Sequence, residues 1–438
     1  MATDASSPRP ARRVWWLLVF LLVLVNTIAW QRQPIAAWLG QMAMSRASLD
    51  DVEAALGYAA LAQRISRQAP EIELARARLE RREGDMAAFR RHLQRARHLG
   101  IAPERAEREQ LLAQAQSGQM RVAGPKLVEL LETAGGDEAE ICEAYAKGYM
   151  RMRDFSSALA LLGAWADDFP NDARPHAWIG QIHAELRATE QAERAFRKAL
   201  DRDPANPSAA FGLGQMLLDL KRSAEAIPFF RIATDDPNIG AAAAAGLAQC
   251  LRAQSRRDQA VQVLHESLQR FPDDEQLLVE QAQMLVEQGN YAEAEKGLQT
   301  LIGAGSRRRE VRYVYATALR GLGRSDEAAK HFEYATEAAE RTAVANRRIA
   351  DVADDPDNAQ LRYEIGAAHL RYGNLEDGLM WLQSALEIDP KHRPTHRALA
   401  DYYERKTADH PRFIHLAQRH RIMGGPSPPG PEQDLRPS

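Results

Sequence analysis

The chain has few of the side chains that carry catalysis or covalent cross-links. Among its 438 residues there are two cysteines, and aromatic residues make up 7%. No Gly-rich phosphate loop, CxxC pair, HExxH or GxSxG motif is present. Cys142 and Cys250 are far apart in the sequence and are expected to be buried as small apolar side chains. We therefore predict no catalytic site, cofactor or metal, and a protein that is not an enzyme.

The chain also has little excess charge. Its 57 lysines and arginines and 60 aspartates and glutamates give a formal net charge of −3. The basic residues are scattered among acidic ones, so no stripe that could follow a phosphate backbone is visible. The sequence therefore predicts no nucleic-acid partner.

Among the residue types that can bind a metal, histidines cluster near the C-terminal end of the sequence. Two interpretations are open, a metal cluster or solvated and edge-packed imidazoles. Pro394 lies between His392 and His396 at an expected helix start, so these two side chains should not share a helical face. This favours the second interpretation for the five histidines between 392 and 420: His392, His396, His410, His415 and His420.

Small residues recur every 34 positions through the middle of the chain, and this is its strongest pattern. A second series follows twelve positions after the first. Two close-packing points per period predict two helices per unit, stacked as a solenoid. The first series is Ala146, Gly180, Gly214, Ala248, Ala282 and Ala316, and the second is Ala158, Ala192, Ala226, Ala260, Ala294 and Ala328.

The unit from 173 to 206 resembles the tetratricopeptide repeat. Gly180, Ala192, Phe196 and Ala199 occupy the small and large apolar positions of that family, and Pro204 occupies its closing position. Steps of 34 residues carry the frame over six units, 139–342, without an insertion. The resemblance implies an all-α, right-handed superhelix of helix-turn-helix pairs.

The regions around the six units are assigned by the same pattern. Residues 70–138 are expected to form two divergent repeats, 343–358 an extended helix or insertion, and 359–392 a further repeat. A helix pair at 393–422 would cap the array, because an uncovered end would expose core. Residues 423–438 include five prolines and are expected to be disordered.

The N-terminal segment 14–30 is apolar and has tryptophans at both ends. Its length is the minimum for a transmembrane helix, and Arg9, Arg12 and Arg13 lie in the basic stub 1–13 before it. This predicts a membrane anchor with a cytoplasmic N-terminus, followed by a helical connector at 31–69. The repeats would then be extracytoplasmic, and periplasmic in a bacterium. A cleaved signal peptide and a secreted protein are the alternative.

The family resemblance implies that the first helix of each unit lines the concave surface. Glutamines recur there at Gln181, Gln215, Gln249 and Gln283, beside Phe211 and Tyr313. Carboxamides can donate to and accept from an extended peptide, but they can equally join adjacent repeats. A basic pair, Lys147 and Arg174, is expected near the first units. A second aromatic and basic group comprises Tyr313, Arg320, Tyr363 and Arg371.

The function that fits these patterns is a membrane-tethered scaffold that binds a protein or peptide on its concave surface. Bacterial proteins of similar layout include envelope-assembly factors, cytochrome c maturation subunits and secretion-linked chaperones, and this similarity covers architecture only. One alternative is a structural spacer of the envelope that self-associates through 343–358. Another is a non-catalytic subunit of an enzyme complex. The oligomeric state is left open.

Overall fold

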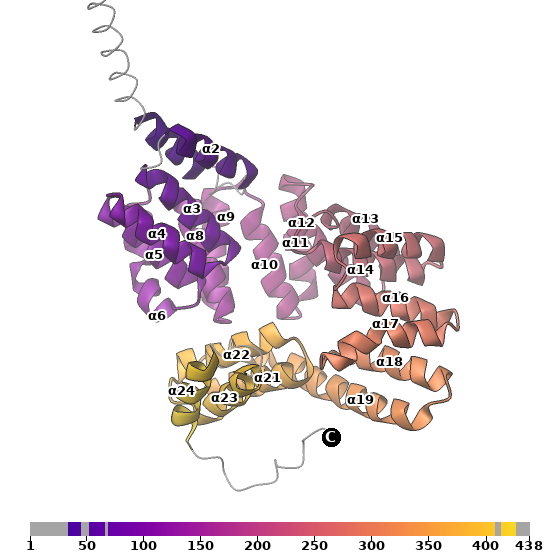
Figure 1. Ribbon diagram of the computed structural model, residues 1–438. Coiled ribbons are helices and arrows are strands. Elements are labelled where there is room, and N and C mark those ends of the chain that lie inside the picture. The colour runs from indigo at the N-terminus through magenta and orange to yellow at the C-terminus, as the bar shows by residue number, and fades with distance from the viewer. Residues whose placement is uncertain (1–33, 45–51, 66–68, 408–412, 426–438) are drawn as a thin grey trace, which may run out of the picture. The chain divides into compact units, whose positions relative to one another are not determined.

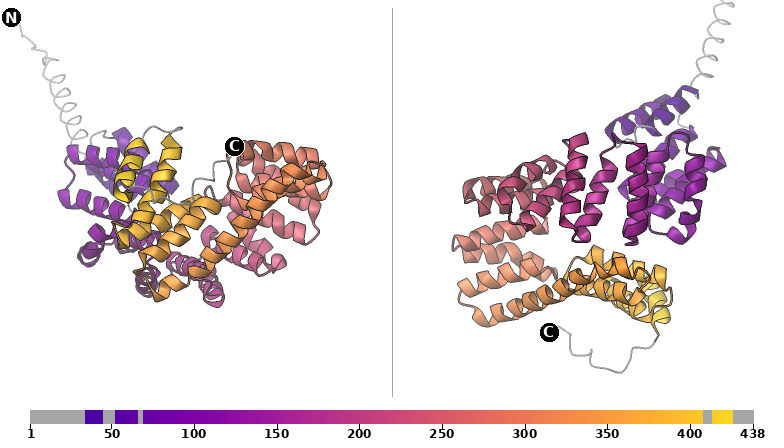
Figure 2. Two further views of the ribbon diagram at one scale, coloured as in Figure 1. Left: turned by 90° about the horizontal axis from the view of Figure 1, so that it is seen from below. Right: turned by 180° about the vertical axis from the view of Figure 1, so that it is seen from behind.

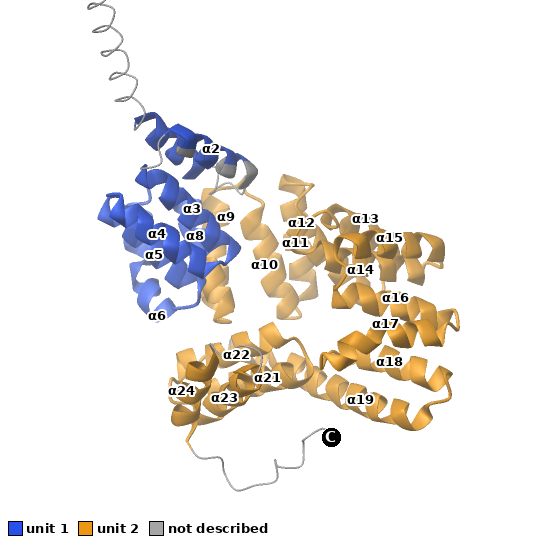
Figure 3. Cartoon of the chain, viewed as in Figure 1, with its two compact units in different colours: residues 1–145 blue, residues 146–438 orange. Residues whose placement is uncertain are grey.

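The computed structural model describes residues 34–44, 52–65, 69–407 and 413–425, and these are helical with no β-strand. They divide into two compact units, residues 1–145 and 146–438 (Figure 3). The predicted stub and membrane anchor at 1–30 and most of the predicted tail at 423–438 lie outside the described residues. Within those ranges, no helix is long and apolar enough to span a membrane.

Unit 1 combines helices of 13 or 14 residues with shorter segments. A helix at 34–44 precedes α2 (Val52–Ile65), and a regular antiparallel pair follows, α3 (Pro70–Glu83) and α4 (Met86–His98). After α5 (Pro103–Gln116), the expected partner helix is broken into α6 (Met120–Ala123), a 3-10 turn (Gly124–Lys126) and α7 (Leu127–Glu132). Pro125 lies at this break, where its ring removes a backbone donor. The second divergent repeat is therefore not a regular helix pair.

Six helix pairs follow with the predicted spacing (Figure 1). α8 lies across the boundary between the units. Successive first helices from α10 to α18 pack on one another and form one layer of unit 2. The pairs are α8 (Glu138–Arg151) and α9 (Phe155–Asp168), α10 (Arg174–Glu185) and α11 (Thr189–Arg202), α12 (Pro207–Asp219) and α13 (Ser223–Ala233), α14 (Gly240–Ala253) and α15 (Arg257–Arg270), α16 (Glu275–Glu287) and α17 (Tyr291–Gly303), and α18 (Arg309–Gly321) and α19 (Ser325–Arg348).

Phenylalanine side chains pack between adjacent first helices of the layer. A Cβ added at Gly180 or at Gly212 would come within 2.6 Å or 2.4 Å of the Phe196 ring. Phe230 lies in the same way between Gly214 and Gly246. The small residues of the repeat therefore make room for a ring, which explains why a glycine or alanine recurs at these positions.

The long second helix of the sixth pair is followed by further helices. α19 ends at Arg348, and a short α20 (Asp351–Asp354) follows after a break of two residues. Ala345 and Val352 are buried within the chain. Two more pairs complete unit 2, α21 (Ala359–Tyr372) with α22 (Leu375–Ile388), and α23 (Arg393–Thr407) with α24 (Ile414–Gly424).

The C-terminal pairs return to the first pair of unit 2 (Figures 1 and 2). Arg362 of α21 donates to the backbone oxygen of Met152 at 2.8 Å, and Arg153 pairs with Asp377 of α22 at 3.0 Å. The Phe155 and Trp381 rings meet edge to face with centroids 6.5 Å apart. Unit 2 is thus closed by contacts between helix pairs more than 200 residues apart in sequence.

Candidate functional site

The four predicted glutamines do not behave as one ladder. Gln181 and Gln215 are exposed on the layer of first helices. Gln249, in contrast, donates from Nε2 to Oε1 of Glu280 in the next repeat, and Gln283 donates to Glu287 of its own helix at 3.5 Å. Gln249 therefore joins two repeats and Gln181, although exposed, hydrogen-bonds Glu185 of its own helix, whereas Gln215 is exposed on α12.

The two predicted aromatic contacts differ in exposure. Phe211 is half-buried and packs edge to face on Phe230, with ring centroids 6.1 Å apart. Tyr313 is 52% exposed and packs edge to face on Phe332, with ring centroids 5.5 Å apart. The guanidinium of Arg320 lies 5.0 Å from the centroid of the same Phe332 ring. The structure therefore brings Tyr313 and Arg320 together as an exposed aromatic and basic pair.

The basic pair predicted at the start of the array is held by neighbours within unit 2. Lys147 places Nζ 5.4 Å from the centroid of the Trp178 ring. Arg174 forms hydrogen bonds with both carboxylate oxygens of Asp172 and lies over the Trp165 ring at 5.1 Å. These contacts stabilise the packing of the first repeats, so Arg174 has little capacity left for a carboxylate of a partner.

Tyr363 and Arg371 both belong to α21. Tyr363 contacts the His392 ring, with centroids 5.6 Å apart, and the Arg371 guanidinium lies 5.0 Å from the centroid of Tyr372. Tyr372 also lines a pocket that the sequence did not predict, so Arg371 borders that pocket.

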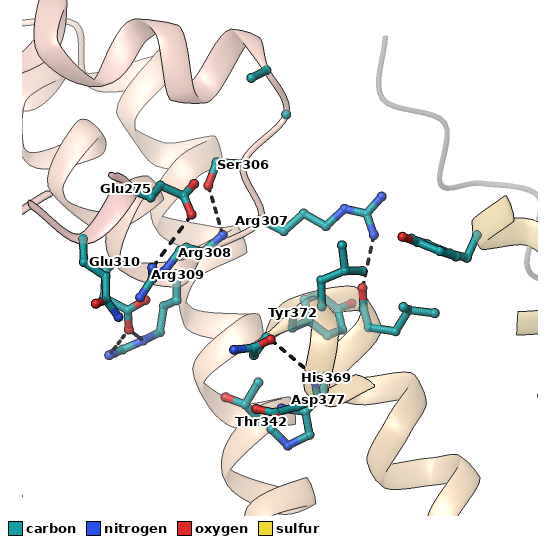
Figure 4. A pocket seen from close by; sticks show the side chains of 18 of the residues that line it. Glu275, Ser306, Arg307, Arg308, Arg309, Glu310, Thr342, His369, Tyr372 and Asp377 are labelled. Atoms are coloured by element: carbon teal, nitrogen blue, oxygen red, sulfur yellow. Dashed lines mark hydrogen bonds and ion pairs between the residues drawn. The ribbon is translucent and has the colours of Figure 1, made fainter. Parts of the chain in front are cut away.

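The pocket has a volume of about 770 Å³ and lies in unit 2. Its walls are the start of α16, the loop and helix start at 304–310, one side of α19, the junction of α21 and α22 at 369–377, and the end of α23 (Figure 4). Amide groups of Gln276, Asn346 and Asn374 share these walls with Tyr372 and Tyr402. A cavity of this size and polarity suits a small molecule or a short stretch of polypeptide.

The lining of the pocket is rich in arginine. Arg307 leads away from Arg308 and Arg309 and donates from Nη1 to the Leu370 carbonyl oxygen at 3.2 Å (Figure 4). Arg405 donates from Nε to the Asp401 carbonyl oxygen at 3.1 Å. Burial lowers the pKa of Arg405, and the positive charges of Arg307 and Arg371 lower it further, against the opposing effect of Asp401. The three guanidinium groups therefore create a positive potential at one side of the pocket.

His369 also lines the pocket and is 9% exposed. Neither of its ring nitrogens has a hydrogen-bond partner in the part of the chain that the structure describes. Burial lowers the pKa of this imidazole, and Arg153 also lowers it, against the opposing effect of Asp377. The ring is therefore neutral near pH 7, with one donor and one acceptor left unused.

The histidine-rich C-terminal region is brought together only in part. His396 and His420 place their Nδ1 atoms 2.8 Å apart. Burial and the charge of His396, with that of Arg419, lower the pKa of His420 to about 4. No group of three metal-ligating side chains occurs within the described ranges, while His410 lies outside them.

Sequence reasoning missed the pocket because its walls come from five separate parts of the chain. The run Arg307, Arg308 and Arg309 at a repeat junction was the available signal. Nothing in the periodicity, however, indicates that α21 and α23 lie against this junction.

The fold and these surfaces define an all-α helical-repeat protein with an exposed layer of first helices and an arginine-lined pocket. Residues 185–238 and 244–365 each match a family model described as tetratricopeptide repeat. These matches support the predicted tetratricopeptide resemblance over the residues that they cover. A comparison with curated protein sequences finds no match.

Several solved structures are similar to parts of the chain. The type IV pilus biogenesis factor PilW is 20% identical, with 51% of this chain and 96% of that chain covered and a TM-score of 0.40. A tetratricopeptide repeat protein from Parabacteroides merdae is 14% identical, with 65% and 98% covered and a TM-score of 0.39. MamA is 21% identical, with 39% and 93% covered and a TM-score of 0.31. Likeness of this degree identifies neither a partner nor a pathway.

Proposed function

We propose that this protein is a membrane-tethered scaffold that holds a protein partner on the layer of first helices in unit 2. The observation that carries the proposal is the exposure of Gln181 and Gln215 on the adjacent first helices α10 and α12, and of Tyr313 on α18, three repeats further along the layer. Carboxamides pair with peptide backbones, and an exposed tyrosine supplies apolar contact area with a polar tip. Tetratricopeptide repeats are typically non-catalytic, which agrees with a binding role.

The tether is the second part of the proposal. The apolar segment 14–30, with arginines before it, supports an N-terminal anchor and repeats outside the cytoplasm. An anchor would confine scaffold and partner to one surface and so raise their local concentration. Extraction of membranes with alkaline carbonate should leave the full chain in the pellet, and protease added outside the cytoplasmic membrane should digest the repeats. Release into the carbonate supernatant would contradict the tether.

The binding surface is tested by site-specific photocrosslinking in cells. A photoreactive amino acid at Gln215 should crosslink to a discrete partner, whereas one at Arg197, exposed on the second helix α11, should not. The partner identified in this way is then purified and titrated against the full chain. The double variant Gln215→Glu and Tyr313→Ala should weaken this binding at least tenfold with no change in thermal unfolding. Equal crosslinking at both positions would overturn the assignment of the surface.

The spacer alternative stays a separate prediction. It requires an unpaired apolar face at 343–358, where Ala345 and Val352 are buried within the same chain and Val344 is 47% exposed. Sedimentation of the full chain at several concentrations tests it, because a spacer would show a concentration-dependent increase in mass.

A further inference from the structure

The charges of the pocket in unit 2 are not balanced by its own residues. Each of the three lining carboxylates already has an arginine partner within the chain. Glu310 pairs with Arg309 at 2.8 Å, Glu275 with Arg308 at 3.9 Å, and Asp377 with Arg153 at 3.0 Å.

The remaining cations have no such partner. Arg307, Arg405 and Lys406 line the pocket, and among the described residues no carboxylate lies within ion-pair distance of them. Arg307 and Arg405 instead donate to single backbone carbonyl oxygens, which leaves most of their donor groups unused. An arginine fork is suited to a carboxylate, which it can bind through two parallel hydrogen bonds.

A buried polar side chain adds to the wall of the same cavity. His369 has two ring nitrogens without a hydrogen-bond partner among the described residues, and the surrounding chain covers both. The imidazole therefore makes this wall polar, and the arginines carry the contact with a ligand.

The mixed lining favours an acidic polypeptide over a nucleic acid. Glu275, Glu310 and Asp377 lie on the walls and would repel a ligand with a phosphate at every unit. Carboxylates separated by neutral residues can reach Arg307 and Arg405 and avoid these positions. The amides of Gln276, Asn346 and Asn374 add partners for a peptide backbone.

We propose that this pocket binds an acidic, extended segment of a protein partner, with its carboxylates on Arg307 and Arg405. The inference rests on the proposed scaffold function and assigns the chemistry of one part of its partner. The pocket is a separate contact from the exposed glutamines of α10 and α12, so that one partner can engage both.

The test uses the full chain and a fluorescent peptide of about eight residues in which glutamate alternates with serine. Fluorescence anisotropy should show saturable binding that weakens as sodium chloride is raised, because the contact is between charges. The matched peptide with glutamine in place of glutamate should bind at least tenfold more weakly. Arg307→Gln and Arg405→Gln should each weaken binding of the acidic peptide about tenfold or more.

Arg324→Gln is the matched control, since Arg324 lies outside the pocket and is paired with Glu327 at 2.7 Å, and it should change the affinity less than twofold. If Arg307→Gln unfolds because its bond to Leu370 is lost, Arg405→Gln keeps the proposal testable. Equal binding of the two peptides, or unchanged affinity in Arg405→Gln, would overturn it. Tighter binding of single-stranded DNA of the same length would overturn it as well.

The photocrosslinking result at Gln215 separates this inference from the proposed function. A partner crosslinked at Gln215 whose affinity is unaffected by Arg405→Gln would leave the scaffold function in place and overturn only the acidic-segment assignment. Absence of a partner at Gln215 together with tight binding of the acidic peptide would contradict the proposed binding surface and leave the acidic-segment assignment in place.

Discussion

At the scale of single residues, the most unusual feature is a buried network of charges in unit 1. Arg78 and Arg81 are each 1% exposed and both bind Glu109. Arg81 also pairs with Glu140, and Arg78 forms two hydrogen bonds with Asp137 at 2.9 and 3.0 Å. Removing one member of such a network strands a buried charge, so the network makes unit 1 sensitive to substitution and to acid.

Glu140 provides the test of this sensitivity. Burial alone would raise the pKa of its carboxyl, but Arg81, Arg78 and Arg82 outweigh that effect and lower the pKa to about 2. A lowered pKa in the folded state means that the stabilisation is complete above the ordinary value of about 4.3 and is lost as the pH falls towards 2. Glu140→Gln should destabilise unit 1 by about 3–5 kcal/mol at pH 7 and reduce this acid dependence.

Urea denaturation of the full chain at a series of pH values, with hydrogen exchange of the α3 and α5 amides, measures both effects. Glu104→Gln, at an exposed position of α5, is the control and should change stability by less than about 0.5 kcal/mol. An equally small change in Glu140→Gln would show that the network contributes little.

At the scale of the helix pair, the turn between first and second helices repeats as regularly as the helices. The residue at this turn has a positive φ in all six pairs: Arg153, Arg187, Lys221, Ser255, Gly289 and Gly323, with φ between 55° and 81°. Only two of the six are glycines. The other four adopt a left-handed conformation that is unfavourable for a residue with a Cβ.

Replacing one of these residues with glycine should therefore stabilise the array. Lys221→Gly removes a cost of about 1 kcal/mol at the turn, partly offset by the greater entropy that glycine gives the unfolded chain. Lys198→Gly, at an exposed position inside α11, should instead destabilise by about 1 kcal/mol. Thermal unfolding of the two variants should move in opposite directions, and a decrease for both would contradict this account of the turn.

A second prediction concerns the packing between repeats. Gly212→Ala would place a Cβ 2.4 Å from the Phe196 ring, which is buried. The resulting overpacking should cost about 1–3 kcal/mol, more than the gain in helix propensity. Gly163→Ala, inside α9 with no atom within 4 Å of the added Cβ, should raise stability by up to about 1 kcal/mol. Chemical denaturation compares the two, and an increase for Gly212→Ala would show that the Phe196 ring can adjust.

The same repeat shows what the sequence could predict. The period of small residues indicated the helix pairs because each marks a close approach between helices, as Phe196 shows at Gly180. The position of the turn could have been predicted in the same way, since Gly289 and Gly323 lie 34 residues apart. Arg153 and Lys221 occupy the equivalent positions of other repeats, so the glycine pattern is incomplete. Whether Gln249 or Gln215 is free depends on where Glu280 lies across the repeat interface. A repeat pattern does not contain that information.

At the scale of unit 2 as a whole, long-range contacts hold the C-terminal helix pairs against the first pair. The repeat pattern does not indicate these contacts. Arg362 is 2% exposed and donates to the backbone oxygens of Met152 and Pro356, both at 2.8 Å. Arg153 pairs with Asp377 and lies 5.1 Å from the centroid of the Trp381 ring. Asp377 and His369 also line the pocket, so the contacts that close unit 2 and the walls of the pocket share residues.

Opening this closure is therefore expected to increase the distance between α9 and α22. Arg362→Met keeps an apolar stem of similar length but removes every hydrogen bond to Met152 and Arg153. Spin labels at Ser156→Cys and Glu376→Cys should then give a longer and broader distance distribution than in the parent chain, because α22 is no longer held against the start of α9. Asp377→Asn, which removes the ion pair with Arg153, should move the distribution in the same direction by a smaller amount.

Arg194→Met, at an exposed position on α11, is the control and should leave the distance distribution unchanged. A distribution that stays narrow in both Arg362→Met and Asp377→Asn would mean that apolar packing of Phe155 on Trp381 is sufficient to keep unit 2 closed.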